Sequence, residues 1–255
     1  MTSSSKPNAT KGASRSVTNP NSSGSKGFWA AMAALVLIGA LVIGLIVYNG
    51  RGAQADRIAE NMQKVDGVSL SLTDNVITLS GDNADGAKEA GLYEDFSCHY
   101  CGELAVNTDD QMLAKIQAGE LTVNLHPLIF LDGTGDQYNA GHSTRALAAV
   151  LALADKGEIE AYWNLRKALM EQQQNLYATA DNDTLADLAH DFGASKGAVE
   201  AIRNGEYTDR AKAMGEANAK DLVDKTGDLS SPRVLVDGKD VPSDPLANWI
   251  DDLFA

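Results

Sequence analysis

YEDFSCHYC, residues 93–101, contains both cysteines of this 255-residue chain, Cys98 and Cys101. Two thiols this close can be bridged by a disulfide when they lie at the start of a helix, so the pair can exist as a dithiol or as a disulfide. Such a pair can pass its oxidation state to another protein. A Cys-x-x-Cys motif alone is a moderate signal, and its meaning depends on the segments on either side.

Those flanking segments are predicted to be a strand and a helix. Glu89–Phe96 (EAGLYEDF) is typical of a short strand that leads into Cys98. The apolar positions of a helix follow at Leu104, Met112, Leu113 and Ile116. Residues 107–110 interrupt this pattern and predict a kink or a restart, with Thr108 or Asp109 as the cap.

This context favours a reactive thiol at Cys98. A cysteine at a helix N-terminus has a pKa well below the usual 8.5 or so, because unpaired backbone N–H groups point at its sulfur. His99 could add positive charge when protonated. Cys101 lies one turn deeper and is suited to resolving a mixed disulfide. A stabilised thiolate stabilises the reduced pair, which makes the oxidised form a stronger oxidant.

Two other interpretations of the cysteine pair are weaker. A structural disulfide across so small a loop would restrain the unfolded chain very little. A zinc site needs four ligands, and the histidines have no metal-binding spacing. We therefore expect no metal and no cofactor. The histidines are His99, His126, His142 and His190.

Composition excludes several classes of partner. The formal net charge is -14, which argues against nucleic acid, because phosphates need clustered Lys and Arg. It also argues against peripheral binding to anionic lipid through basic residues. A hydrophobic content of 44% is enough for a substantial core.

Membrane attachment is predicted by another feature, Phe28–Tyr48 (FWAAMAALVLIGALVIGLIVY), which contains no charged residue. Its length matches the roughly 20 residues that a helix needs to cross the bilayer core. Because basic residues without acidic ones precede it, the positive-inside rule places residues 1–27 in the cytoplasm and the rest of the chain outside. A cleaved signal peptide is the alternative, since Ala53-Gln54-Ala55 resembles a cleavage site, but its apolar stretch would be shorter. The basic residues are Lys6, Lys11, Arg15 and Lys26.

The chain is predicted to have four parts: a disordered tail (1–27), a transmembrane anchor (28–48), a linker with a small hairpin (49–80) and an α/β domain (81–255). The hairpin is expected because Val68–Leu72 and residues 76–79 alternate on either side of Asp74-Asn75.

Strands and helices alternate within residues 81–255, which predicts an α/β layer fold. Leu121–Leu131 (LTVNLHPLIFL) reads as a buried strand in which Pro127 requires an edge, a bulge or a strand end. A helical block at about 138–226 is too long for one crossover, so we expect an inserted subdomain. A strand at Arg233–Val236 and an amphipathic stretch at Pro245–Phe254 complete the domain.

Residues 93–101 resemble the active-site segment of the DsbA-like thiol–disulfide oxidoreductases in the thioredoxin superfamily, which commonly reads aromatic-x-Asp-Phe-x-Cys-Pro-x-Cys. Residues 231–239 (SPRVLVDGK) are similar to the family's Thr-Pro-x-x-x-Val-Asn-Gly-Lys loop, whose proline is cis and packs beside the cysteines. The helical block between the central strand and that proline also matches DsbA. The resemblance covers about residues 80–255 and implies a thioredoxin-like fold with a helical insertion.

The resemblance implies a role for each matching residue. Cys98 would be the attacking thiol and Cys101 the resolving thiol. Pro232 would be the cis proline, and Ser231 would contact substrate through its backbone. The two residues between the cysteines, residues 99–100, would tune the redox potential.

The sequence also departs from the family pattern. His99 replaces the usual Pro, and Tyr100 stands where DsbA has His. Leu92 occupies the place of a buried Glu found in many relatives. Glu94 or Asp95 could relay protons instead, or could be satisfied polar groups at the strand end. These departures leave the direction of exchange open.

The sequence therefore predicts a single-pass membrane protein whose outward-facing domain introduces disulfides into newly exported proteins. The resemblance implies a membrane quinone-linked thiol oxidase as reoxidant. An apolar groove beside the cysteines and Pro232 would bind unfolded substrate as an extended strand. The alternatives are a disulfide reductase or isomerase of the same fold, and a non-catalytic binding module for exported chains in which the cysteine pair is inert.

Overall fold

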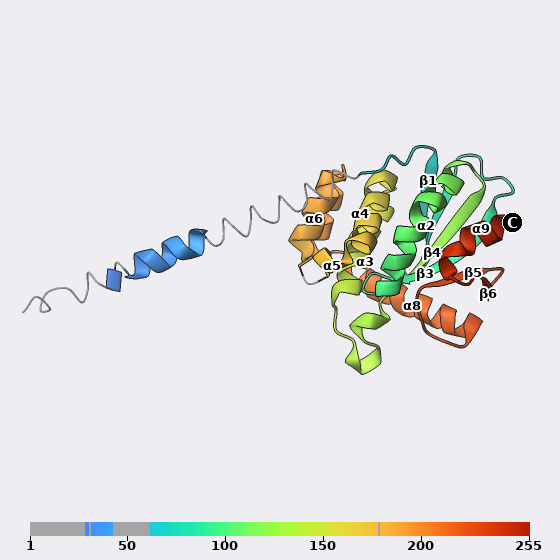
Figure 1. Ribbon diagram of the computed structural model, residues 1–255. Coiled ribbons are helices and arrows are strands. Elements are labelled where there is room, and N and C mark those ends of the chain that lie inside the picture. The colour runs from blue at the N-terminus through green and yellow to red at the C-terminus, as the bar shows by residue number, and fades with distance from the viewer. Residues whose placement is uncertain (1–28, 31, 43–61, 178) are drawn as a thin grey trace, which may run out of the picture. The chain divides into compact units, whose positions relative to one another are not determined.

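The computed structural model describes residues 29–30, 32–42, 62–177 and 179–255. The chain divides into two compact units, Met1–Asn49 and Gly50–Ala255. In the first unit, residues 29–30 and 32–42 are helical (blue in Figure 1). Over the described residues, no helix has both the length and the apolar character needed to cross a membrane. The described residues do not include the predicted tail, residues 28, 31 and 43–48 of the predicted anchor, or residues 49–61 of the linker.

The second unit is built on a sheet whose described strands follow the order β1-β2-β4-β3-β5-β6. β3 and β4 are parallel, and every other neighbouring pair is antiparallel. A parallel pair needs a crossover, which α2 (His99–Gln117) supplies. The expected α/β thioredoxin-like fold is confirmed. The strands are β1 Val68–Thr73, β2 Val76–Gly81, β3 Lys88–Asp95, β4 Leu121–Leu128, β5 Arg233–Val236 and β6 Lys239–Asp240.

The expected hairpin is present as β1 and β2, but it is not a separate element of a linker. β2 pairs with β4, and Ile77 lies opposite Leu125. Ile77 and Leu79 are fully buried in the main core. The sheet therefore begins before residue 81, the predicted domain boundary, because the apolar face of β2 is needed to cover that core.

The strand predicted around Pro127 is β4, and the proline lies near its end. The pairing of β2 with β4 stops at Leu125, whereas β3 continues alongside as far as Leu128. Of the three possibilities that the sequence left open for Pro127, the structure adopts the strand end, where the missing N–H interrupts no further pairing with β2.

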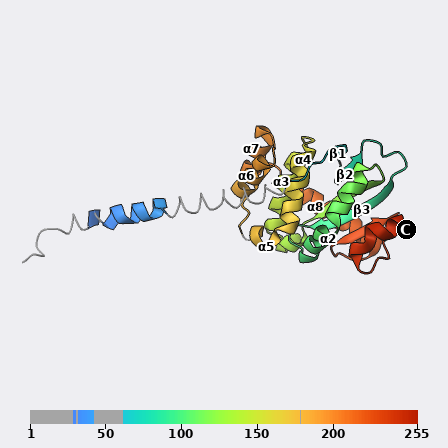
Figure 2. The ribbon, with the colours of Figure 1, turned by 45° about the horizontal axis from the view of Figure 1, so that its top comes forward.

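The helices match the predicted order, with the insertion between β4 and β5. In both views α3, α4 and α6 lie to one side of the sheet, away from β5 and α9 (Figure 1, Figure 2). α8 packs Leu222 against Tyr93 and Leu235 of the sheet. The helices are α2 His99–Gln117, α3 His142–Ala154, α4 Ile159–Glu171, α5 Gln173–Leu176, α6 Asn182–Asp191, α7 Lys196–Asn204, α8 Thr208–Thr226 and α9 Trp249–Phe254, with short 3₁₀ turns at Phe130–Asp132, Gly135–Gln137 and Leu246–Asn248.

The predicted kink in the helix after the cysteines is wrong, since α2 runs unbroken through Thr108 and Asp109. Thr108 Oγ1 donates to the Leu104 carbonyl at 2.8 Å, so this hydroxyl is satisfied within the helix. Asp109 is buried and faces α4 instead of capping a new helix. Polar residues here indicate a buried ion pair, not a helix boundary.

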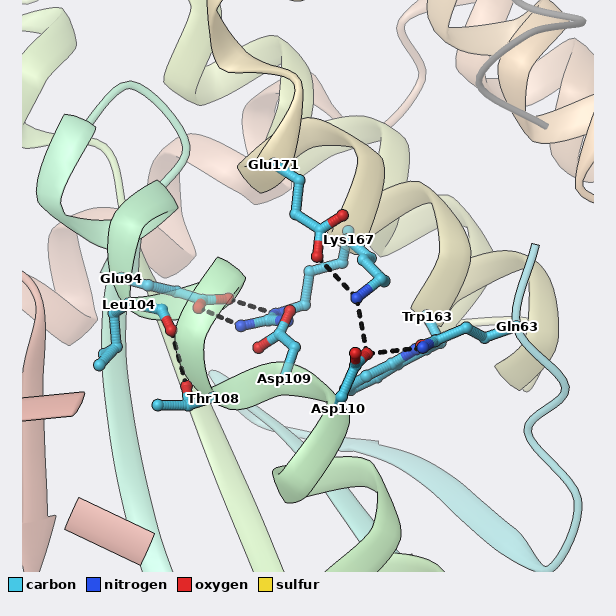
Figure 3. Close-up of polar contacts among 10 residues, drawn as sticks. Gln63, Glu94, Leu104, Thr108, Asp109, Asp110, Trp163, Lys167 and Glu171 are labelled. Atoms are coloured by element: carbon cyan, nitrogen blue, oxygen red, sulfur yellow. Dashed lines mark hydrogen bonds and ion pairs between the residues drawn. The ribbon is translucent and has the colours of Figure 1, made fainter. Parts of the chain in front are cut away.

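The buried ion pair belongs to a triad of three charged residues, Glu94, Asp109 and Arg166. Arg166 on α4 donates to Glu94 at 2.8 and 2.6 Å and to Asp109 Oδ2 at 2.8 Å. Figure 3 shows Glu94 and Asp109 converging from β3 and α2. All three side chains are almost fully buried. The triad therefore joins the strand before the cysteines, the helix after them and the inserted subdomain.

Replacing Arg166 with Met should lower the free energy of unfolding by about 3–5 kcal/mol, because two carboxylates would be left buried without their partner. Urea unfolding of the purified domain measures the change. The matched control is Arg203→Met, because Arg203 forms exposed ion pairs with Asp183 and Asp187. Such pairs contribute about 0–1 kcal/mol. A loss at Arg166 no larger than at Arg203 would contradict the role of the triad.

Candidate active site

The two cysteines lie where the sequence predicts, between a strand and a helix. β3 ends at Asp95, Cys98 caps α2, and α2 begins at His99. The Ser97 N–H donates to Asp95 Oδ1 at 2.9 Å, and the Cys98 N–H donates to the Asp95 carbonyl at 2.9 Å. These bonds form the turn that places Cys98 at the helix N-terminus. Both cysteines are free thiols and both are buried.

The second predicted segment meets the first at Cys98. The Ser231–Pro232 peptide bond is cis, as expected. The Cys98 thiol donates to the Ser231 carbonyl at 3.4 Å. Asp244–Pro245 is also cis, which the sequence did not predict. The fold thus brings the loop before β5 against the Cys98 sulfur, across more than a hundred residues of sequence.

The Cys98 thiol has a pKa lowered to about 5, chiefly by the hydrogen bond from the Cys101 thiol. Burial opposes this shift, while the Ser231 side chain and the backbone N–H groups of Cys101 and Tyr100 reinforce it. The expectation that peptide dipoles act on the sulfur is therefore correct, but the neighbouring thiol has the larger effect.

Cys101 has the opposite environment. Burial raises its pKa, and the hydrogen bond and charge of Cys98 raise it further. The backbone N–H of Asp95 donates to Cys101 Sγ at 3.4 Å. At neutral pH the pair therefore holds one thiolate, on Cys98, and one thiol proton, on Cys101.

The two residues between the cysteines point outward. His99 is exposed and lies 3.1 Å from Glu103, one turn along α2. Its imidazole is not among the main groups that lower the pKa of Cys98. Tyr100 is also exposed and borders a pocket.

That pocket lies beside the cysteines and measures about 400 Å³. Tyr100 and Leu104 line it from α2, and Pro232 lines it from the cis-proline loop. Glu103 and Asn107 add polar groups at its edge. The remaining lining residues are Pro245, Leu246 and Ala247.

The structure distinguishes the two acidic residues that the sequence left as possible proton relays. Glu94 belongs to the buried triad, whereas Asp95 contacts Cys101 through its backbone N–H and has a separate set of partners for its carboxyl. The Asp95 carboxyl accepts from the Leu131 N–H at 3.2 Å and from the Ser143 hydroxyl at 2.5 Å. Burial raises its pKa to about 6.

Ser143 is a residue of this site that sequence reasoning missed. Besides Asp95, its hydroxyl contacts the Ser97 hydroxyl at 2.7 Å. It comes from α3, 46 residues after Ser97, and no local motif marks it. Across the described residues there is no group of three or more His, Cys, Asp or Glu side chains that could hold a metal ion.

Comparison with known proteins identifies the family. The sequence pattern of the family described as Thioredoxin matches residues 82–252. The chain belongs to the thioredoxin family. A search of curated proteins found no match.

Two solved structures narrow the class within this family. One is MdbA, a thiol–disulfide oxidoreductase from Corynebacterium matruchotii, with 36% identity over 78% of this chain and 98% of that one, at a TM-score of 0.73. The other is MdbA from Corynebacterium diphtheriae, with 40% identity over 76% of this chain and 97% of that one, at a TM-score of 0.71. MdbA from Actinomyces oris is 16% identical over 77% of this chain and 93% of that one, at a TM-score of 0.55. This likeness shows the fold alone. This protein is therefore a DsbA-like thiol–disulfide oxidoreductase.

The reduced protein should be alkylated at Cys98 with a rate that rises between about pH 4 and 6 and then levels off. The reason is that the thiolate, which reacts, is present above its pKa of about 5. Cys101 should stay unmodified at neutral pH because it remains a buried thiol. Mass spectrometry of samples quenched at each pH measures both sites.

The matched variant is Cys101→Ala, which removes the donor that contributes most to the low pKa. The midpoint should move upward in this variant. A wild-type midpoint near the ordinary value of about 8.5, or equal alkylation of both cysteines, would contradict the described electrostatics.

Proposed function

We propose that this protein oxidises thiols of exported proteins and so introduces disulfides into them. The observation that carries the proposal is the asymmetry of the cysteine pair, with a lowered pKa at Cys98 and a raised pKa at Cys101. The enzyme class comes from the family, and the direction of exchange is argued from this asymmetry.

The reaction would start from the Cys98–Cys101 disulfide. A substrate thiolate attacks Cys98 Sγ, which forms a mixed disulfide and expels Cys101 as a thiolate that takes up a proton. A second substrate thiolate then attacks the substrate sulfur of the mixed disulfide and expels Cys98 as a thiolate. The substrate loses two electrons and two protons in total, and the cysteine pair gains the two electrons.

The low pKa favours this direction. At pH 7 a thiol that titrates near 5 is about two pH units past its midpoint, whereas an ordinary cysteine is still protonated. This ionisation stabilises the reduced pair by roughly 2.7 kcal/mol. For a two-electron couple, the potential rises by roughly 60 mV. The pair becomes a better oxidant by that amount.

The roles assigned from the family resemblance fit this reaction. Cys98 exchanges with substrate, and Cys101 leaves and returns as the resolving thiol. The pocket between Tyr100 and Pro232 would hold an extended substrate segment whose backbone meets Ser231. His99 and Tyr100 would adjust the potential through their positions between the cysteines.

The catalytic domain is proposed to lie outside the cell membrane, with residues 28–48 as a single-pass anchor and the N-terminus in the cytoplasm. Residues 32–42 are helical, and Leu35, Leu37 and Leu41 are exposed apolar side chains on that helix. A quinone-linked thiol oxidase of the membrane would take the two electrons and regenerate the disulfide. Fractionation of cells tests the anchor: loss of residues 28–48 should move the protein out of the membrane fraction, and a full-length protein found only in the soluble fraction would contradict it.

Cys98→Ser and Cys101→Ser test the exchange reaction with a reduced, unfolded secreted protein as substrate. Cys98→Ser should reduce oxidation to the uncatalysed background. Cys101→Ser, supplied as a mixed disulfide with a small thiol at Cys98 and given a substrate that retains a single thiol, should pass to a stable protein–protein mixed disulfide, because neither a second substrate thiol nor a thiol at position 101 is there to release it. Non-reducing gel electrophoresis and mass spectrometry detect that species.

Unchanged oxidation in Cys98→Ser would overturn the proposal. A wild-type pair that mild thiols never reduce, with no trapped species in Cys101→Ser, would indicate a non-catalytic binding module. Net reduction of substrate disulfides under the same conditions would indicate a reductase.

A further inference from the structure

Gln173 connects the helical insertion to the turn that carries Cys98. It is the first residue of α5 and is half-buried. Its side-chain Nε2 donates to the Phe96 carbonyl at 3.1 Å and to the Cys98 carbonyl at 2.9 Å. A single side-chain amide from the insertion thus donates hydrogen bonds to the backbone on both sides of Ser97.

The Cys98 carbonyl is also the first acceptor of α2. It receives the N–H of Cys101 at 3.1 Å and the N–H of Gly102 at 3.2 Å. The oxygen that starts the helix and the oxygen that Gln173 binds are therefore the same atom. If Gln173 moves, the Cys98 carbonyl, which accepts the first hydrogen bonds of α2, loses a donor and can move as well.

Gly102 provides the space for this contact. A Cβ atom at that position would lie 2.9 Å from Gln173 Oε1 and 2.7 Å from the Met170 carbonyl. Glycine inside a helix is unfavourable by about 1 kcal/mol relative to Ala, and packing is the usual reason to keep it. Here the missing side chain lets α4 and α5 approach the first turn of α2.

Neighbouring glutamines do not share this geometry. Gln174 is exposed, and Gln172 accepts at Oε1 from Asn175 within the same short segment. Of the run Gln172–Gln174, it is the middle residue whose amide reaches the backbone on both sides of Ser97. The sequence run alone does not show which of the three has this role.

We propose that Gln173 is a positioning residue, which fixes the strand-to-helix turn and so holds the Cys98 sulfur in place beside the first turn of α2 and the Cys101 thiol. This inference rests on the proposed role of Cys98 as the exchanging thiol. It adds that the helical insertion acts directly on the cysteine pair, through one side chain of α5.

The physical consequence concerns the charged form of Cys98. The Cys101 thiol and the backbone N–H groups of Cys101 and Tyr100 favour the thiolate, and their effect depends on their distance from the Cys98 sulfur, which the turn sets. Without Gln173, the Phe96 and Cys98 carbonyls lose a donor and the turn can relax. The thiolate then loses part of its support, whereas the fold keeps its core.

The test is Gln173→Leu, which keeps most of the side-chain volume and removes the donor. Titration of the reduced protein by thiolate absorbance in the ultraviolet should show the pKa of Cys98 raised by about one unit. Gln173→Glu should raise it at least as far, because a carboxylate faces two carbonyl oxygens and lies near the sulfur. The matched control is Gln174→Leu, on the exposed side of the same segment, which should leave the pKa unchanged.

A folded Gln173→Leu protein with the wild-type pKa would overturn the inference, and so would an equal shift in Gln174→Leu. If Gln173→Leu does not fold, Gln173→Asn serves instead, because it is shorter by one methylene and cannot span to both carbonyls. The shift and the oxidation of substrate are separate readouts. A shift in Gln173 variants of a protein that oxidises no substrate supports the positioning role and contradicts the proposed function alone.

Discussion

The structure depends on one constraint, the stabilisation of negative charge on the Cys98 sulfur. The Cys101 thiol lowers the pKa of Cys98 most, and the Ser231 side chain and the first N–H groups of α2 lower it further. The three contributions come from one helix turn and from a loop more than 130 residues away. The parallel pair of β3 and β4, with α2 as its crossover, makes the first part, and β5 beside β3 brings the loop to the same end of the sheet.

Three helices of the insertion, α3, α4 and α5, contact the segment that carries the cysteines. Arg166 on α4 pairs with two buried carboxylates, Glu94 before the cysteines and Asp109 after them. Ser143 on α3 donates to Asp95, and Gln173 on α5 donates to the Cys98 carbonyl. Arg166 and Ser143 are buried and Gln173 is half-buried, and each finds its partner in the thioredoxin core. The insertion is therefore an integral support of the redox site and more than a cover beside it.

Local patterns in the sequence were sufficient for the strand, the cysteine pair and the following helix, because these elements are contiguous. The cis bond at Pro232 also follows from its loop, through family resemblance. Asp109 was misread as a cap because its partner, Arg166, lies 57 residues further along the chain. Ser143 and Gln173 were missed for the same reason, since a serine or glutamine in a helical segment gains its role only from tertiary contacts.

The most direct test of this account is the equilibrium of the purified domain with reduced and oxidised glutathione. If hydrogen bonds to Cys98 hold it as a thiolate at neutral pH, the reduced pair is favoured. The reduction potential should then lie closer to DsbA's roughly -120 mV than to thioredoxin's roughly -270 mV. A potential at or below roughly -270 mV would contradict a pair poised to give disulfides to other proteins.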